Sequence, residues 1–97
     1  MRAVQLADIE AAARILLKRD RCERNTTMAS LYDHARIADG YRKRLGVPHP
    51  DFGTGTLMSA AAGFQAAPRP PRCNLDYLEC IGIVVAFLSE RATNQIV

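Results

Sequence analysis

Residues 28–56, MASLYDHARIADGYRKRLGVPHPDFGTGT, decide the fold, because they begin as a patterned helix and become a loop after Gly46. Apolar residues in the helical part recur at alternating steps of three and four, which lays a narrow seam along one helix face. The seam consists of Met28, Leu31, Ala35, Ala38 and Leu45, with Arg42 at the one missing place. A glycine such as Gly46 supplies the left-handed residue at which helices commonly end. The seam is too short for a self-sufficient coiled coil, so it must dock on the rest of the chain or on a second copy.

The loop over residues 47–55 is rich in proline and glycine. Its two prolines push the residues before them away from helix, so the segment has a definite extended shape. Tyr41 precedes this stiff segment, and His49 and Phe52 lie within it. We expect these three residues to form part of a partner-binding surface. The alternative is that Phe52 is buried and pins the loop to the core, and the sequence does not separate the two interpretations.

A first helix is expected over residues 7–18, where Leu6, Ile9, Ala13 and Leu16 repeat at three and four. The polar segment 20–26 is interpreted as a connector, with the second helix starting near Thr27 after a cluster of capping residues.

Two further helices follow the loop. Thr54 or Thr56 is expected to cap a short helix over residues 57–63, and Asn74 to cap a last helix over 75–91. Between them, residues 65–72 form a proline-rich connector that can be neither helix nor central strand.

The last helix is apolar over more than half of its circumference, which is typical of a helix that is central in a fold or lies between subunits. Because three short neighbours cannot cover it, we expect a homo-oligomer. The residues expected to carry self-association are Ile81, Val84, Val85 and Leu88.

The whole chain, 97 residues, is expected to form a single helical domain, 1–97. Hydrophobic residues make up 48% and charged residues 24%, which is ordinary globular usage and argues against disorder. Abundant alanine and the absence of alternating β-branched residues favour helix. The predicted fold is therefore all-α, a compact bundle of about four helices with a Pro/Gly-rich loop between the second and third.

The net charge is +3, and it is unevenly distributed: ten basic and six acidic residues precede residue 49, while three and four follow. An excess this small permits a polyanionic partner without requiring one. No helix-turn-helix pattern is convincing, so sequence-specific reading of DNA is not expected. Weak, non-specific DNA binding is expected at the end of the second helix, through Arg36, Arg42, Lys43 and Arg44.

Catalytic and metal sites are not expected. No serine or cysteine lies in a nucleophile motif, and the three cysteines form no C-x-x-C pair. Cys80 is interpreted as a buried hydrophobic residue, and the GTGT turn as a helix cap, since it lacks the lysine of a phosphate-binding loop. No cofactor is expected. The odd thiol count, the missing signal peptide and the short apolar runs predict a cytoplasmic protein with no membrane contact.

Three stretches carry a family resemblance: LADIEAAARILL (6–17), YRKRLGVPHPDFGTGTLMSAAAG (41–63) and NLDYLECIGIVVAFL (74–88). They combine an arginine-rich helix end, an H-P pair, an F-G-x-G turn and a short alanine helix. The matching positions are Tyr41, Gly46, His49, Pro50, Gly53, Gly55, Leu57 and Met58. In these features the chain resembles a family of small alphaproteobacterial proteins that is similar to the small terminase-like, DNA-packaging proteins of gene transfer agents.

The resemblance implies an oligomeric, non-enzymatic adaptor that brings DNA to a large terminase subunit. The chain departs from the phage pattern because it lacks an evident DNA-recognition module. A small helical regulatory or accessory protein–protein interaction module with no DNA role is the alternative, and an enzyme that uses His49 is a distant third.

Overall fold

A computed structural model describes residues 2–70 and 74–96, except for the side chains of residues 92–96. It contains helices α1 (Leu6–Lys18), α2 (Arg21–Leu45), α3 (Leu57–Ala61) and α4 (Leu75–Ile96). No strand occurs within these ranges, and a single isolated bridge joins His49 to Gly53. The predicted all-α fold of four packed helices is confirmed.

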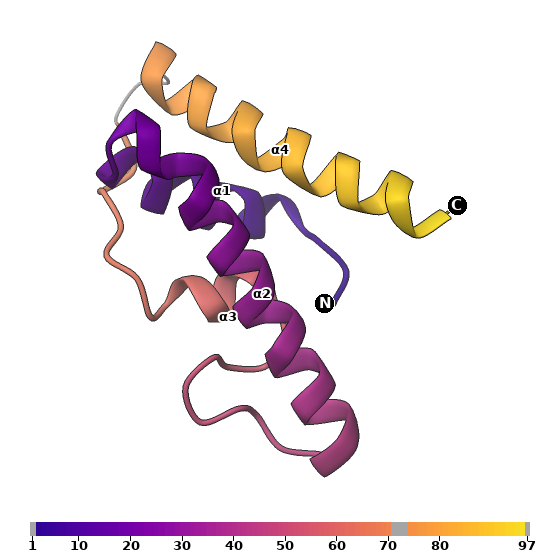
Figure 1. Cartoon of the computed structure of the whole chain (residues 1–97). Helices are drawn as coiled ribbons and strands as arrows, with labels where there is room; N and C mark the ends of the chain where they lie inside the picture. Colours follow the sequence, from indigo (N-terminus) through magenta and orange to yellow (C-terminus); the bar gives the residue numbers. More distant parts are fainter. Residues whose placement is uncertain (1, 71–73, 97) are drawn as a thin grey trace.

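Helix α1 is central, since α3 and α4 each pack more extensively on α1 than on α2, although α2 also contacts all three other helices. Helix α4 lies across the top of the molecule, and its carboxy-terminal part extends past the other helices (Figure 1). The lower half of α2 and the loop that follows it project downward, away from α4 (Figure 1). The sequence predicts that the last helix is either central in the fold or between subunits. The central position is wrong, because α4 covers α1 from outside.

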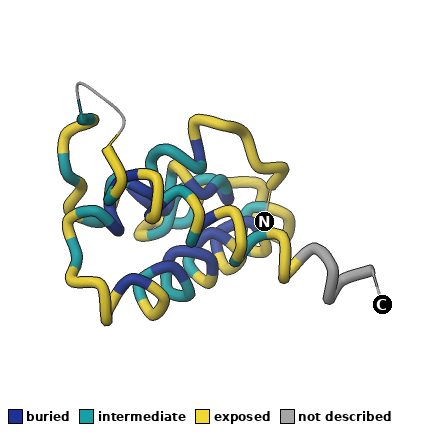
Figure 2. The backbone as a smooth tube through the Cα atoms, turned by 90° about the horizontal axis from the view of Figure 1, so that it is seen from above, coloured by how far each residue is buried: buried dark blue, intermediate teal, exposed yellow. Residues whose placement is uncertain are grey.

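The core lies where α1 meets the other helices, and its buried residues are dark blue along the backbone tube in Figure 2. Each of the four helices contributes at least one small and one branched side chain to this core. Its members are Ala12, Ala13, Ile15, Leu16, Met28, Leu31, Ala35, Leu57, Ala60, Ala61, Tyr77, Cys80 and Val84.

The seam predicted for α2 is confirmed over its first four members, since Met28, Leu31, Ala35 and Ala38 have no exposed surface. It is wrong for Leu45, which is 59% exposed, because the last turns of α2 run beyond the helices that cover the seam.

The joint between α1 and α2 is much shorter than predicted. Helix α2 begins at Arg21 rather than near Thr27, so only Arg19 and Asp20 lie between the helices. Within this polar segment, Arg24 is only 4% exposed and turns its guanidinium back toward the end of α1. Its Nε donates to the carbonyl oxygens of Leu16 at 2.9 Å and Arg19 at 3.3 Å, which adds a side-chain cap at the end of α1, where the N–H of Arg19 also donates to Leu16.

The other helix ends follow from capping chemistry. Gly46 ends α2 with φ of 73°, as predicted. Of the two threonines considered for the third helix, Thr56 is the cap, because its side chain accepts from the backbone N–H of Ser59. Asn74 caps α4 by accepting from the N–H of Tyr77 at 2.7 Å. Helix α3 ends at Ala61, earlier than predicted, and α4 continues to Ile96, past the predicted 91.

Asp8 joins the starts of two helices. It is 4% exposed, and one carboxylate oxygen accepts from the N–H of Gln5 at 2.8 Å in the capping box of α1. The other oxygen accepts from the N–H of Met58, in the first turn of α3, at 3.0 Å. One side chain thus fixes the position of α3 against α1 and sets where the preceding loop must end.

Candidate partner-binding surface

The loop after α2 is organised by His49. Its backbone N–H donates to the carbonyl of Gly53 at 2.8 Å, and its carbonyl accepts from the N–H of Gly53 at 3.2 Å. Its Nδ1 accepts from the N–H groups of Asp51 and Phe52, at 3.0 and 3.1 Å. The ring therefore carries its proton on Nε2 and caps its own turn.

Five rings from different parts of the chain lie in one row, which we call the ring row. Its members, in order, are Tyr41, His49, Phe52, His34 and Phe64. Phe52 is stacked between the two imidazoles, with ring centroids 3.9 Å from His34 and 4.6 Å from His49. Tyr41 and Phe64 close the two ends, at 4.8 and 5.5 Å. The structure therefore brings together the three residues that we expected at a surface.

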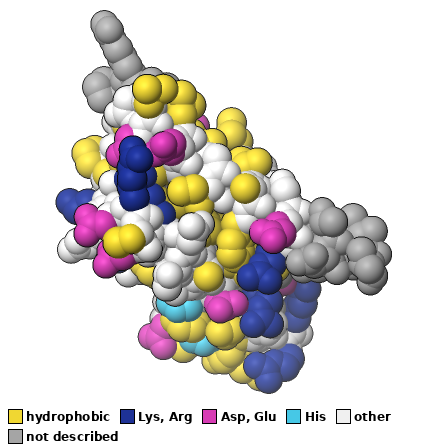
Figure 3. Space-filling model, turned by 45° about the horizontal axis from the view of Figure 1, so that its top comes forward, with side chains coloured by type: hydrophobic (Ala, Val, Ile, Leu, Met, Phe, Trp, Pro, Cys, Tyr) yellow, Lys and Arg dark blue, Asp and Glu magenta, His cyan; other side chains and the backbone are white. Residues whose placement is uncertain are grey.

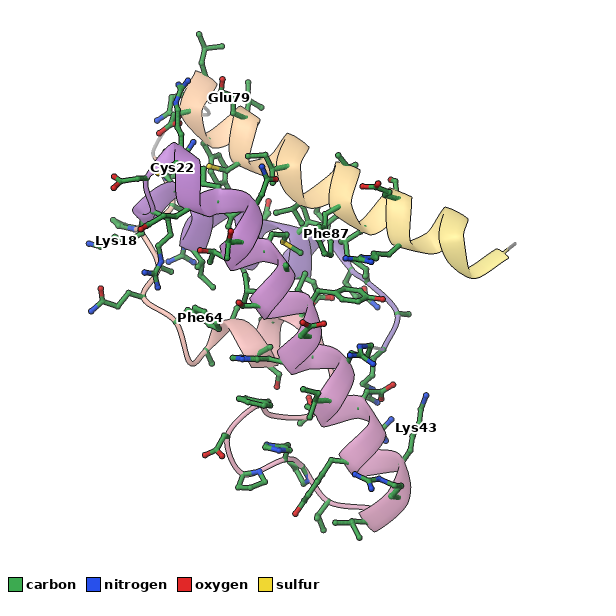
Figure 4. All side chains as sticks on the ribbon, in the orientation of Figure 1. Lys18, Cys22, Lys43, Phe64, Glu79 and Phe87 are labelled. Carbon is green, nitrogen blue, oxygen red and sulfur yellow. The ribbon has the colours of Figure 1, made fainter. Side chains whose placement is uncertain are left out.

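All members of the ring row are partly buried. The row attaches the loop to α2 through His34 and Tyr41 and reaches the segment after α3 through Phe64, which Figure 4 labels. Phe52 holds the loop on α2 and keeps part of its surface in solvent, so it has features of both interpretations left open above.

Sequence reasoning missed His34 and Phe64. A signal existed for His34, since it precedes Tyr41 by seven residues, two helical turns, on the same face of α2. No comparable signal identifies Phe64.

Glycines let the loop return closely onto α2. Gly55 has φ of 100°, and a Cβ placed there would lie 2.8 Å from both Cα and Cβ of Asp39. Gly53 has φ of 87°, and its Cβ would lie 2.5 Å from Oγ of Ser59. That same Oγ accepts from the N–H of Thr54 at 3.1 Å. The GTGT turn is thus a close-packed return that precedes the Thr56 cap.

Asp39 partly neutralises the basic end of α2. It is 2% exposed, and its carboxylate lies 3.0 Å from Nζ of Lys43 and 3.4 Å from Nη2 of Arg42. Burial acts to raise the pKa of Asp39, but hydrogen bonding and charge attraction, those of Lys43 included, outweigh it, so the pKa is lowered. The carboxylate stays ionised at neutral pH.

The four cationic residues expected to bind nucleic acid divide into two groups. Arg36, Lys43 and Arg44 are exposed on the outer side of α2, whereas Arg42 takes the seam position and is only partly exposed. Arg36 lies 3.7 Å from Asp33, and Nε of Arg44 donates to the carbonyl of Gly40. Basic side chains gather at the lower right of Figure 3, the end at which Figure 4 places Lys43.

The same end of α2 exposes apolar side chains. Ile37, Leu45 and Val47 are 45%, 59% and 49% exposed. Gly40 lies between Ile37 and Arg44 along the helix, and a Cβ there would meet no atom within 4 Å. We call residues 36–47 the α2 tip: a projecting helix end that offers cations and apolar groups together.

Residues 2–88 match the model of a family described as Domain of unknown function (DUF7742). The chain belongs to the DUF7742 family. The matched span includes the whole ring row and the α2 tip. No curated protein and no solved structure matches the chain.

Within the DUF7742 chain, one residue expected to mediate self-association does not lie on the surface. Val84 has no exposed area and packs in the core, since it lies on the α4 face turned toward α1. That expectation is wrong. Val85, by contrast, is 43% exposed, and Ile81 and Leu88 are partly buried.

Cys80 of the DUF7742 chain is buried, and burial raises the pKa of its thiol, as suits a hydrophobic packing role. Cys73 lies outside the described residues. Where the structure describes side chains, no three His, Cys, Asp or Glu residues are grouped as a metal ion would need. None of the described helices is long and apolar enough to cross a bilayer.

Proposed function

We propose that the protein is a non-enzymatic adaptor that acts by binding, with the α2 tip and the ring row as its contact surface. The observation that carries this proposal is the combination of exposed cations and exposed apolar side chains on a projecting helix end. Exposed apolar groups beside charge are typical of interaction sites rather than of an unused solvated face. The ring row favours this use, because it holds the loop in one conformation before any partner arrives.

The proposed setting is DNA packaging, as implied by the resemblance to the small terminase-like proteins of gene transfer agents. The partner would then be a large terminase subunit, with the protein contacting DNA weakly and without regard to sequence. The charges of the α2 tip fit weak contact. Arg36 and Lys43 each lie close to a carboxylate. Arg44, the third exposed cation on the outer side of α2, instead donates a hydrogen bond to a backbone carbonyl.

Fluorescence anisotropy with two duplexes of unrelated sequence, each at two or more salt concentrations, tests the DNA contact. Replacing Lys43 and Arg44 together with alanine should weaken binding equally for both duplexes. It should also flatten the plot of log K against log salt by about two phosphate contacts. Lys18→Ala is the control, since Lys18 is an exposed cation at the end of α1. A preference for one duplex, or an unchanged slope, would place the DNA surface elsewhere.

A second candidate is an interaction module with no DNA role, favoured by the partial neutralisation of the α2 tip by Asp33 and Asp39. If this candidate is right, the protein should not bind DNA in a salt-dependent manner, and partner binding should fail when the apolar groups are changed. Leu45→Ser with Val47→Ser is the matching double variant, because both side chains are exposed and their loss leaves the core intact. A co-purification assay with the large terminase subunit separates it from the first candidate.

A further inference from the structure

The outer face of α4 carries an exposed stripe with helix-pairing spacing. Leu75, Leu78, Gly82, Val85 and Ser89 follow one another at steps of three and four, and all five are exposed. Leu75 is 82% exposed, Leu78 48% and Val85 43%. This spacing aligns side chains on one side of a helix, as in paired helices, and the stripe contains no charge. Hydrophobic side chains are visible over the upper part of Figure 3, where α4 lies.

A hollow lies beside the second half of this stripe. It measures about 300 Å³ and is lined by Val4, Ile9, Val85, Leu88 and Ser89. Its walls come from the amino-terminal segment, α1 and α4, and none of these side chains is charged. The first half of the stripe, in contrast, carries the two protruding leucines, Leu75 and Leu78.

The protrusions and the hollow lie on opposite sides of Gly82 at matching distances. Leu75 and Ser89 are each seven residues from Gly82, or about 10 Å along the helix. Leu78 and Val85 are four and three residues away. A two-fold interface requires one face to carry both a protrusion and its hollow, placed symmetrically about the axis. Along the helix axis, the α4 stripe meets that requirement.

We propose that two copies of this chain pair through antiparallel α4 helices, with the two-fold axis passing beside Gly82. The leucines of each copy then enter the hollow of the other. The stripe itself offers a polyanion or an acidic partner no cation to bind, and the charged side chain beside it, Glu79, is acidic.

Gly82 fits this arrangement and has no other evident purpose. A glycine within a helix costs about 1 kcal/mol relative to alanine. Its φ is not in the left-handed region, and a Cβ placed there would meet no atom within 4 Å, so the chain's own packing does not require it. At a two-fold axis a glycine lets two helix backbones approach closely.

The size of the face sets the expected strength. From Leu75 to Ser89 the stripe is about 21 Å long on a helix about 10 Å wide. Even with the walls of the hollow, the total buried area falls below roughly 1,200 Å², the lower end for specific interfaces. The dimer should therefore be weak, with a dissociation constant in the micromolar range. It leaves the α2 tip of each copy free, because that end projects away from α4 (Figure 1).

Oxidative cross-linking tests the geometry. In a background with Cys22 and Cys73 replaced by serine, and with buried Cys80 retained, Gly82→Cys should form a disulfide-linked dimer. Leu75→Cys and Ser89→Cys should each fail to link to themselves, because copies of one residue are about 21 Å apart. A mixture of these two variants should link. Self-linking of Leu75→Cys would overturn the antiparallel arrangement, as would a folded Gly82→Cys chain that stays unlinked.

Sedimentation equilibrium of the unchanged chain gives the second readout. The mass should approach that of a dimer at concentrations well above micromolar, and Leu78→Asp should raise the dissociation constant at least tenfold. Met58→Asp is the matched control, since Met58 is similarly exposed, 45%, but lies on α3. A monomer mass at every concentration, or an equal effect of both variants, would overturn the proposal.

Discussion

Arg24 donates two hydrogen bonds to the carboxylate of Asp76, Nη1 to Oδ1 at 2.8 Å and Nη2 to Oδ2 at 3.2 Å. The same guanidinium caps α1, so one buried side chain of α2 holds the end of α1 and the start of α4. The hydrogen bonds from Arg24 lower the pKa of Asp76 from its ordinary value of 3.8, against the opposing effect of burial. The hydrogen bond to Asp76 also raises the pKa of Arg24, so the pair stays charged.

The first prediction concerns acid. A carboxylate whose pKa is lower in the folded chain contributes stability above its unfolded pKa, and this stability is lost as the pH falls through the folded pKa. Asp76→Asn should therefore lower the melting temperature at pH 7. Between about pH 5 and pH 2 it should also flatten the pH dependence of that temperature. Glu90→Gln, an exposed carboxylate change on the same helix, should do neither. An Asp76→Asn profile parallel to that of the parent chain would contradict the prediction.

The second prediction uses two glycines. Gly55→Ala should destabilise the chain by about 2 kcal/mol or more, since left-handed backbone alone costs about 1–3 kcal/mol for other residues. The added methyl would also press on Asp39. Gly40→Ala should instead stabilise the chain by about 0.5–1 kcal/mol, because it lies within α2 with open space around it. Urea denaturation of both variants measures the two changes in the free energy of unfolding. Changes of the same sign would contradict the prediction.

The third prediction separates the two interpretations of Phe52. If the ring only pins the loop, Phe52→Ala should lower stability by about 1–3 kcal/mol through lost stacking and burial, and the melting temperature should fall by several degrees. If Phe52 serves a partner, the fold should hold while binding of the large terminase subunit or packaging fails. Val47→Ala, at an exposed loop position, is the stability control.

The fourth prediction concerns Asp8. Asp8→Ala removes the acceptors of two backbone N–H groups and should cost about 1–3 kcal/mol, since one lost cap costs about 0.5–2 kcal/mol. Hydrogen exchange should accelerate at the amides of Gln5 and Met58. Asp20→Ala is the control, because Asp20 stands at the start of α2 without a side-chain capping bond. Unchanged exchange at Met58 would show that Asp8 does not hold α3.

Most of the fold could be predicted because it depends on local signals. Gly46, Thr56 and Asn74 act as helix ends by chemistry within a few residues, and the seam of α2 follows from spacing alone. Leu45 broke the pattern because spacing shows which face a residue occupies, not how far the covering helices extend. The start of α2 was misplaced because Arg24 finds its partners across the joint and in α4, distant from its own segment.

The site was less accessible to sequence reasoning. Tyr41, His49 and Phe52 were grouped from their proximity in the chain, whereas His34 joins them only once the loop folds back. The neutralisation of Lys43 by Asp39 follows a four-residue helical spacing and could have been found. The burial of Asp39, which keeps its carboxylate beside Lys43, could not have been found in this way, because this burial depends on Gly55 packing against Asp39.

The central position of α1 has a consequence for biosynthesis. The apolar face of α1 is covered by α4, which is synthesised later than α1, α2 and α3. Until then Ile15 and Leu16 lack a complete set of partners, so this chain cannot fold segment by segment as it is made. A nascent chain arrested before α4 should accordingly remain sensitive to protease and bind chaperones that recognise exposed apolar helices.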